Sequence, residues 1–235
     1  MKIDGPRLPA ASGKADALVV LLHGYGADGN DLIELGGQWR RILPNAAFVA
    51  PHAAAAIPGF PPGMGGGRQW FALDAYDPNL LRRDPQRTAS VFATMLGGAE
   101  QVAPALNDFL DTELARHSLS GDRLALVGFS QGTMMALHVG LRRPVAPACI
   151  LGYSGAMLGA DRLKEQMTAR PPVLLIHGDA DDVVPVEALF VAVNGLNEAS
   201  CPARWHISKG IGHGIAPDGL ELGGAFLAES LKRAG

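Results

Sequence analysis

Residues 124–137 read LALVGFSQGTMMAL, and this stretch decides the fold. An apolar run typical of a buried strand leads directly into a helical segment, and the pattern G-x-S-x-G lies at their junction. Such a sharp turn puts Ser130 in a strained conformation, and Gly128 and Gly132 let neighbouring backbone approach without a Cβ clash. The strain exposes the Ser130 Oγ above the sheet edge, where the N–H groups of the helix start favour negative charge. We therefore interpret Ser130 as a nucleophile; the alternative is an ordinary strand-to-helix turn with a capping serine.

Short apolar runs alternate with longer amphipathic segments along the chain, which is typical of a mostly parallel sheet with helices on both faces. Most strand candidates are continuously apolar, as expected when both sheet faces are covered. The predicted strands are residues 17–22, 46–50, 123–127, 148–151, 173–176 and 204–207. The predicted helices are residues 31–42, 87–116, 131–142, 186–197 and 218–232, with candidate breaks in the second at 97–98 and at Pro104. Without a repeat or a dividing linker, we predict a single α/β domain over residues 1–235.

The amino-acid composition excludes several functional classes. With 48% hydrophobic residues among 235, the chain can bury a sizeable core, and its net charge of −3 lacks the basic footprint of a nucleic-acid binder. No apolar run approaches the roughly 18 residues that span a bilayer, so we expect no stable membrane insertion. Pro6, Pro9 and Gly13 interrupt any secretory apolar core, and a cytoplasmic protein is expected. Cys149 and Cys201 are expected to be buried thiols, with a disulfide as the alternative.

A serine nucleophile needs a base, and the base needs an acid that orients it. Where the nucleophile sits on a strand-to-helix turn of an α/β sheet, these residues follow one another along the chain in the order serine, acid, histidine. Four histidines follow Ser130. His138 would lie two turns into the helix, His206 is expected to be a strand side chain, and His177 ends an apolar run where it would brace a loop. His213 lies in a glycine-rich loop between the last strand and the last helix, from which its imidazole can reach the sheet edge. We predict that His213 is the base.

The acid should lie in the loop after the predicted strand 173–176, which comes before the last predicted strand. This strand and its loop, residues 173–185, read VLLIHGDADDVVP and offer three aspartates. Spacing alone does not decide between Asp179, Asp181 and Asp182. Asp179 can turn the loop through its own backbone, and Asp182 can cap the next helix. Three neighbouring carboxylates also suggest a cation site, but the glycine and glutamate of an EF-hand loop are missing, so no metal ion is expected.

An oxyanion hole needs two N–H donors. The first is the residue after the nucleophile, Gln131, and the second comes from the loop after an early strand. Residues 19–29, VVLLHGYGADG, supply such a loop, in which Tyr25 or a neighbour would donate. We expect His23 to be a structural brace rather than an acid or base.

Residues 51–86 do not fit the alternation of strands and helices, because prolines and glycines recur throughout them. Connections of this length without secondary structure are uncommon and are often functional. The apolar side chains within the segment, which include Trp70 and Phe71, predict that it forms a wall of the substrate pocket near the active site. The alternative is a surface excursion packed by its own side chains.

Five motifs together resemble the phospholipase/carboxylesterase family of α/β-hydrolases, which includes bacterial carboxylesterases and acyl-protein thioesterases. They are LHGYG at 22–26, WF at 70–71, GFSQG at 128–132, HGDAD at 177–181 with VP at 184–185, and GH at 212–213. The resemblance runs from residue 17 to the C-terminus. It implies Asp181 as the acid and Tyr25 as the second oxyanion donor. We also assign Trp70, Phe71 and Val184 to the substrate pocket.

Two departures from the family pattern stand out. The family often carries Trp-Phe-Asp, whereas here Ala72 and Leu73 separate Phe71 from Asp74. Thioesterases of the family often have leucine where this chain has Tyr25, which predicts a narrower or more polar pocket beside a backbone donor that is retained.

These assignments predict a serine hydrolase with a Ser-His-Asp triad that cleaves carboxylic esters or thioesters of short to medium acyl chains through an acyl-enzyme. It needs no cofactor. The first alternative is a lysophospholipase or acyl-protein thioesterase acting on long acyl chains. The others are a serine peptidase and a non-catalytic binding protein of the same fold. The expected partner is a small-molecule substrate, and a homodimer is considered because the apolar-rich segment 51–86 could pair.

Overall fold

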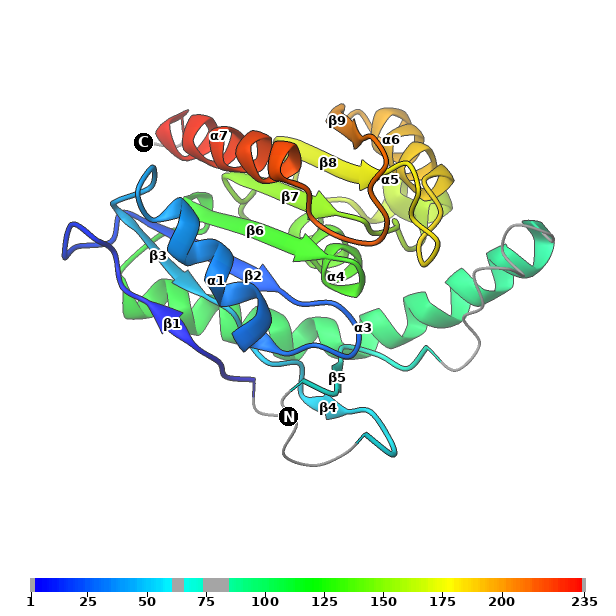
Figure 1. Ribbon diagram of the computed structural model, residues 1–235, viewed down its shortest axis with the longest axis horizontal. Helices are drawn as coiled ribbons and strands as arrows, with labels where there is room; N and C mark the ends of the chain where they lie inside the picture. The colour runs from blue at the N-terminus through cyan, green and yellow to red at the C-terminus, as the bar shows by residue number, and fades with distance from the viewer. Residues whose placement is uncertain (1–2, 61–65, 74–84, 234–235) are drawn as a thin grey trace.

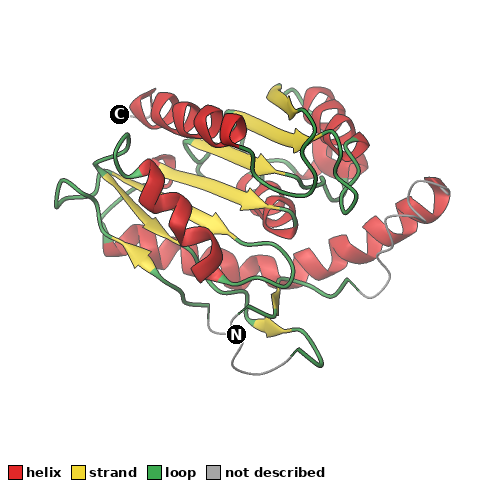
Figure 2. Cartoon of the chain, in the orientation of Figure 1, coloured by secondary structure: helices red, strands yellow, loops and turns green. Residues whose placement is uncertain are grey.

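A twisted sheet carries helices on both faces (Figures 1 and 2). A computed structural model describes residues 3–60, 66–73 and 85–233. The main sheet consists of β1 (Arg7–Leu8), β2 (Ala17–Leu22), β3 (Ala46–Val49), β6 (Leu124–Phe129), β7 (Cys149–Tyr153), β8 (Val173–Gly178) and β9 (Ala203–Ser208). Within the described residues their spatial order is β1-β3-β2-β6-β7-β8-β9. Among the described strands of this main sheet, β1 pairs with β3 in antiparallel fashion and the other pairs are parallel, which confirms the predicted, mostly parallel sheet.

Side chains of β2, an interior strand of the sheet, alternate between two apolar cores. The longer helices are α1 (Gly29–Trp39), α3 (Pro85–Arg116), α4 (Gln131–Gly140), α6 (Glu187–Glu198) and α7 (Pro217–Arg233). Leu18 and Val20 join the core formed with α3, α4 and α6. Val19 and Leu21 join the core formed with α1 and α7, which cover the near face in Figure 1. Because both faces are covered, β2 is buried along its whole length, which explains its continuously apolar sequence.

Helix α3 runs without interruption from Pro85 to Arg116, so the breaks considered at 97–98 and Pro104 are wrong. A Cβ on Gly98 would lie 2.6 Å from the Cβ of Phe71, so this glycine permits close packing rather than ending the helix. Beyond Pro104, Leu106 and Leu110 are fully buried. This tertiary packing holds the helix together where proline removes an internal hydrogen bond.

Several short elements were not expected from the sequence. β4 (Ala55–Ala56) and β5 (Arg68–Gln69) form a small antiparallel pair within the segment 51–86. The remaining parts of that segment, residues 61–65 and 74–84, lie outside the described residues, and 85–86 belong to α3. The other short elements are α5 (Leu163–Gln166) and 3-10 turns at Gly121–Arg123 and Ala160–Arg162.

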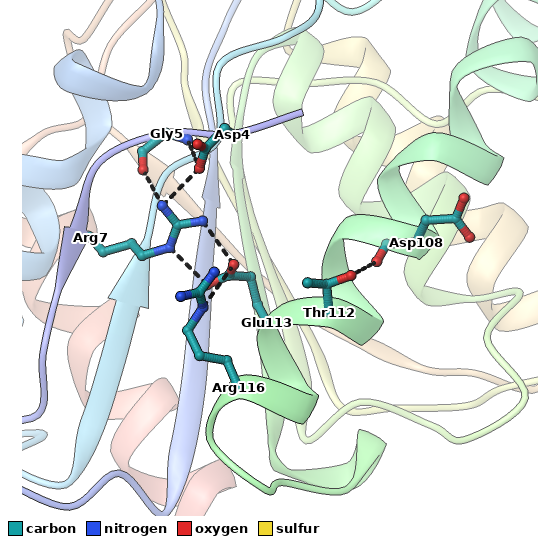
Figure 3. Close-up of polar contacts among 7 residues, drawn as sticks. All are labelled: Asp4, Gly5, Arg7, Asp108, Thr112, Glu113 and Arg116. Atoms are coloured by element: carbon teal, nitrogen blue, oxygen red, sulfur yellow. Dashed lines mark hydrogen bonds and ion pairs between the residues drawn. The ribbon is translucent and has the colours of Figure 1, made fainter. Parts of the chain in front are cut away.

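An ion-pair cluster fastens β1 to α3 (Figure 3). The guanidinium of Arg7 donates from Nε and Nη2 to the two carboxylate oxygens of Glu113, at 2.9 and 2.8 Å. Arg116, one helical turn further along α3, lies 3.3 Å from the same carboxylate, and Arg7 also contacts Asp4 at 2.7 Å. The Glu113 side chain is 1% exposed. This bidentate pair ties the first strand to a residue of α3 that lies 106 positions later in the chain.

Both cysteines are free and buried, which confirms the prediction of two buried thiols. Burial raises the pKa of the Cys149 thiol to about 12, so the group stays protonated and packs as a small apolar side chain. In the part of the chain that the structure describes, no helix is both long and apolar enough to cross a membrane.

Candidate active site

Ser130 lies between the last residue of β6 and the first residue of α4. Strand β6 ends at the carboxyl edge of the parallel strands, where α4 begins (Figure 1). Its backbone has φ 53° and ψ −116°, a conformation that costs a non-glycine residue about 1–3 kcal/mol. Its N–H donates to the carbonyl of Tyr153 on β7 at 2.9 Å, which holds the strained turn to the sheet. Strain of this kind, held by its surroundings, is the geometry that the G-x-S-x-G pattern predicts.

The two glycines of the pattern are required by close backbone approach. A Cβ on Gly132 would lie 1.8 Å from the carbonyl oxygen of Leu22, at the end of β2. A Cβ on Gly128 would lie 2.4 Å from the carbonyl of Gly132 itself. Neither overlap can be relieved by moving a flexible side chain, because the contacted atoms are backbone. Helix α4 therefore starts in contact with the end of β2, which brings the loop after β2 beside Ser130.

His213 and Asp181 meet across two loops at the same sheet edge. Asp181 follows β8 and His213 lies between β9 and α7, and His213 Nδ1 is 2.8 Å from Asp181 Oδ2. Asp181 Oδ1 accepts the backbone N–H groups of Val183 and Val184 at 2.9 and 2.8 Å. Because an ionised carboxylate only accepts, Nδ1 of His213 carries the proton and Nε2 is left to act as an acceptor. This is the tautomer that a general base requires.

The Asp181 carboxylate is also contacted by a second imidazole. His177 Nε2 lies 3.4 Å from Asp181 Oδ2 and 2.8 Å from the carbonyl oxygen of Val184. Burial by itself disfavours the charged carboxylate, but hydrogen bonds from His177, His213 and the Val184 N–H outweigh it and hold the pKa of Asp181 well below its usual range. Asp181 therefore stays ionised. From the sequence, His177 was expected only to brace a loop. Its spacing of four residues from Asp181 was the one feature of the sequence that could have indicated this contact.

The other two aspartates have different surroundings. Asp179 Oδ1 accepts the N–H of Gly210 at 2.6 Å, and the neighbouring Ala180 N–H donates to the carbonyl of Ile211 at 3.0 Å. These contacts fasten the loop that carries His213. Asp182 is exposed. Of the three aspartates that spacing left open, Asp181 is thus the one that contacts His213.

The candidate oxyanion donors lie on either side of Ser130. Gln131 is the first residue of α4, where helix geometry leaves its N–H without an internal partner. The loop after β2 passes close by, since a Cβ on Gly24 would lie 3.3 Å from the Cβ of Ser130. Tyr25, the next residue, is 44% exposed and lines the same cavity as Ser130.

A cavity of about 500 Å³ joins these groups. Its described lining consists of Tyr25, Leu73, Met95, Ser130, Gln131, Met134, Val183, Val184 and His213. Val184, which the sequence assigned to the substrate pocket, lines this cavity together with other apolar residues, and its contact with substrate stays a prediction. Trp70 and Phe71, assigned to the same pocket, are 2% and 5% exposed and belong to the hydrophobic core instead. Their aromatic surface is buried against neighbouring elements, and this part of their assignment is corrected.

Three further histidines, His23, His138 and His206, are not part of the described lining of this cavity. His23 is fully buried, and burial lowers its pKa to about 4. His138 is buried in α4, where burial likewise lowers its pKa to about 4. His206 on β9 lies 2.7 Å from Asp218 at the start of α7. No cluster of three or more His, Cys, Asp or Glu side chains suited to a metal ion occurs within residues 3–60, 66–73 and 85–233.

The parallel sheet, the strained serine after β6 and the histidine and aspartate in the loops after β9 and β8 define an α/β-hydrolase, as predicted. The chain belongs to the phospholipase/carboxylesterase family, whose model matches residues 4–231. It is 27% identical to acyl-protein thioesterase 1 of Neurospora crassa, over 97% of this chain and 92% of that protein. It is 25% identical to esterase YpfH of Escherichia coli, over 86% of this chain and 77% of that protein.

Solved structures give the same result. The crystal structure of esterase PE8 aligns with a TM-score of 0.86 at 45% identity, covering 97% of this chain and 99% of that one. Family membership confirms the predicted resemblance, and at this level it also confirms the prediction of a hydrolase.

Proposed function

We propose that the protein is a serine carboxylesterase that cleaves carboxylic esters or thioesters of short to medium acyl chains, with Ser130 as nucleophile. One observation carries the proposal: the strained Ser130 and His213 line one cavity, and Asp181 holds the Nδ1 side of the His213 ring at 2.8 Å. The similarity to proteins named as esterases and as acyl-protein thioesterases supports the same chemistry.

The proposed reaction has two steps. His213 Nε2 takes the hydroxyl proton as Ser130 Oγ attacks the acyl carbonyl, and Asp181 stabilises the imidazolium that forms. The N–H groups of Gln131 and Tyr25 bind the oxyanion. The alcohol or thiol leaves with the proton held by His213, and a water molecule activated by the same imidazole then releases the acid.

The second candidate is hydrolysis of long-chain acyl groups, as by an acyl-protein thioesterase or a lysophospholipase. Several curated relatives carry the name acyl-protein thioesterase 1, which favours it. The described lining offers either kind of substrate an apolar wall for the acyl chain, which includes Met95 and Met134. A series of p-nitrophenyl esters and matched thioesters of increasing chain length separates the two. A maximum in kcat/KM at long chains would replace the first candidate by the second.

Ser130→Ala tests the catalytic proposal. Turnover of p-nitrophenyl butyrate should fall by about 10⁵–10⁶-fold, as in other hydrolases of this chemistry, because the nucleophile is lost. Covalent labelling by a fluorophosphonate should disappear as well. Ser200→Ala is the matched control, since Ser200 also has a positive φ of 58° but follows α6 at the opposite edge of the sheet. Retained turnover in Ser130→Ala would reject the assignment, and a wild-type protein that the probe does not label would favour a non-catalytic binding protein.

A cytoplasmic location and a homodimer stay predictions from the sequence. Size-exclusion chromatography with light scattering measures the mass directly. A mass corresponding to one 24.5 kDa chain would reject the dimer.

A further inference from the structure

Three segments far apart in the chain meet behind the proposed oxyanion hole. They are the loop after β2 that contains His23, the pair Trp70–Phe71 that follows β5, and the first turn of α4 at Gln131. The side chains of His23, Trp70 and Gln131 are almost completely buried. Buried polar groups of this kind are stabilising only when they are hydrogen-bonded, so their partners reveal what the cluster holds in place.

The Trp70–Phe71 pair is bonded to Gln131 through both functions of its amide. The backbone N–H of Trp70 donates to Gln131 Oε1 at 2.8 Å, and Gln131 Nε2 donates to the carbonyl of Phe71 at 2.7 Å. A backbone N–H only donates and a carbonyl only accepts, so the orientation of the Gln131 amide is fixed by its partners. The residue whose backbone is the first oxyanion donor is therefore clamped by its own side chain.

Trp70 also holds the loop of the second donor. Its indole Nε1–H donates to the carbonyl of His23 at 2.9 Å, and its ring packs on the His23 imidazole with the ring centres 5.3 Å apart. The His23 ring is fixed from its far side, where Nε2 accepts the backbone N–H of Ala53 at 2.9 Å. The proton of the neutral ring is therefore on Nδ1.

That proton is directed at the peptide group that carries the second donor. His23 Nδ1 lies 2.7 Å from the carbonyl oxygen of Gly24. The Gly24 carbonyl and the Tyr25 N–H belong to one planar trans peptide, so they point in opposite directions. Fixing the carbonyl on His23 thus fixes the direction of the Tyr25 N–H, and the bond also polarises that N–H.

We propose that Trp70 and the side chain of Gln131, acting with the His23 imidazole, are positioning residues that hold the two oxyanion donors in register. The inference rests on the proposed function. It gives Trp70 a task that core packing alone does not require, because a core residue needs only the ring, whereas here the indole N–H and the backbone N–H bond to the two donor segments. The substrate-pocket role expected for Trp70 is replaced by one behind the pocket.

The first experiment uses Trp70→Phe, which keeps an aromatic ring but removes the indole donor. We expect kcat to fall by about 10-fold with KM unchanged, a fraction of the 10²–10³ lost when an oxyanion donor is removed outright. The inhibition constant of an alkyl trifluoromethyl ketone, which forms an oxyanion on Ser130, should rise in parallel. Trp39→Phe is the matched control, because the Trp39 indole donates to the carbonyl of Leu220 at 3.1 Å between α1 and α7. It should lower the melting temperature without changing kcat.

A second experiment separates the two nitrogens of His23. Asparagine places an amide nitrogen near the position of Nδ1, and glutamine reaches the position of Nε2. His23→Asn should therefore retain about 10-fold more kcat than His23→Gln, whichever of the two is more stable. Equal kcat for the pair, or Trp70→Phe with unchanged kcat and inhibitor affinity, would reduce the network to packing and overturn the proposal. Failure of the proposed function is a separate result, seen as turnover that survives Ser130→Ala.

Discussion

Two buried carboxylates, Asp181 and Glu113, have closely similar surroundings but different roles. Asp181 belongs to the candidate active site, whereas Glu113 belongs to the ion-pair cluster that holds β1 to α3. The Asp181 side chain is 0% exposed and the Glu113 side chain is 1% exposed, and each contacts two basic side chains. The partners of Asp181 are His177 and His213. Arg7 and Arg116 are the corresponding partners of Glu113 (Figure 3). In both cases burial raises the carboxyl pKa, but the hydrogen bonds from these partners lower it by a larger amount, so both pKa values lie below their usual range.

What differs is the chemistry of the partners and what lies beyond them. Arginine cannot give up its proton in a protein, so the cluster around Glu113 can only hold β1 to α3. Imidazole exchanges protons near neutral pH, and His213 lines a cavity together with the strained Ser130. A buried carboxylate with a lowered pKa therefore does not by itself mark an active site. A titratable partner next to a nucleophile does.

If Asp181 were only structural, it would not differ in role from Glu113. The substitution Asp181→Asn tests this difference and has the largest expected effect. The asparagine amide would donate towards His213 Nδ1 and favour the wrong tautomer, so kcat should fall by about 10⁴-fold. Turnover of p-nitrophenyl butyrate measures the loss. Asp179→Asn keeps an acceptor for the Gly210 N–H and Asp182→Asn changes an exposed group, so both should retain most of the activity. A loss at either position equal to that of Asp181→Asn would reject Asp181 as the acid.

The opposite pattern is expected at the N-terminal cluster. Arg7→Ala leaves the Glu113 carboxylate buried with Arg116 at 3.3 Å as its remaining arginine partner, and should lower the free energy of unfolding by about 3 kcal/mol. Urea unfolding measures this change, and kcat in the absence of urea should not change. Arg116→Ala is the control, since Arg116 is 54% exposed and such pairs contribute less than about 1 kcal/mol. A loss of kcat in folded Arg7→Ala would show that the two clusters are coupled.

Much of the fold could be predicted because most of its strands can be recognised from short stretches of sequence. β2, β6 and β8 are short apolar runs, and their burial on both faces follows from the helices on either side. β1 could not be read in this way, since two residues carry no periodicity and the strand is held by pairing with β3 and by the Arg7–Glu113 bond. The breaks considered in α3 failed for a related reason, because Phe71 packs against Gly98 from a distant segment.

The candidate site divides in the same way. Ser130 and His213 were predicted from their places between a strand and a helix, where the chain order is constrained. Spacing could not decide between three aspartates in one loop, because the direction of each carboxylate depends on backbone turns that the sequence does not specify. Trp70 was assigned to the pocket because an apolar side chain in a long loop suggests a pocket wall. Its hydrogen bonds to His23 and Gln131 depend on contacts across 47 and 61 residues.

The smallest expected effect is the pH dependence of the free energy of unfolding that Glu113 causes, and it refines the comparison between Glu113 and Asp181. The pKa of Glu113 is lower in the folded protein, so its contribution to stability is complete above the unfolded value of about 4.3 and is lost as the pH falls through the folded pKa. Glu113→Gln should therefore cost about 1.5 kcal/mol at neutral pH, from the loss of charge-assisted hydrogen bonds, and progressively less below about pH 4.3. Urea unfolding at a series of pH values measures this difference. The acid limb of kcat should be the same in Glu113→Gln as in the wild type, because Glu113 is not part of the proposed proton relay. A difference in stability that persists unchanged at acid pH would mean that the Glu113 carboxylate acts through packing, and that its likeness to Asp181 is one of geometry rather than of charge.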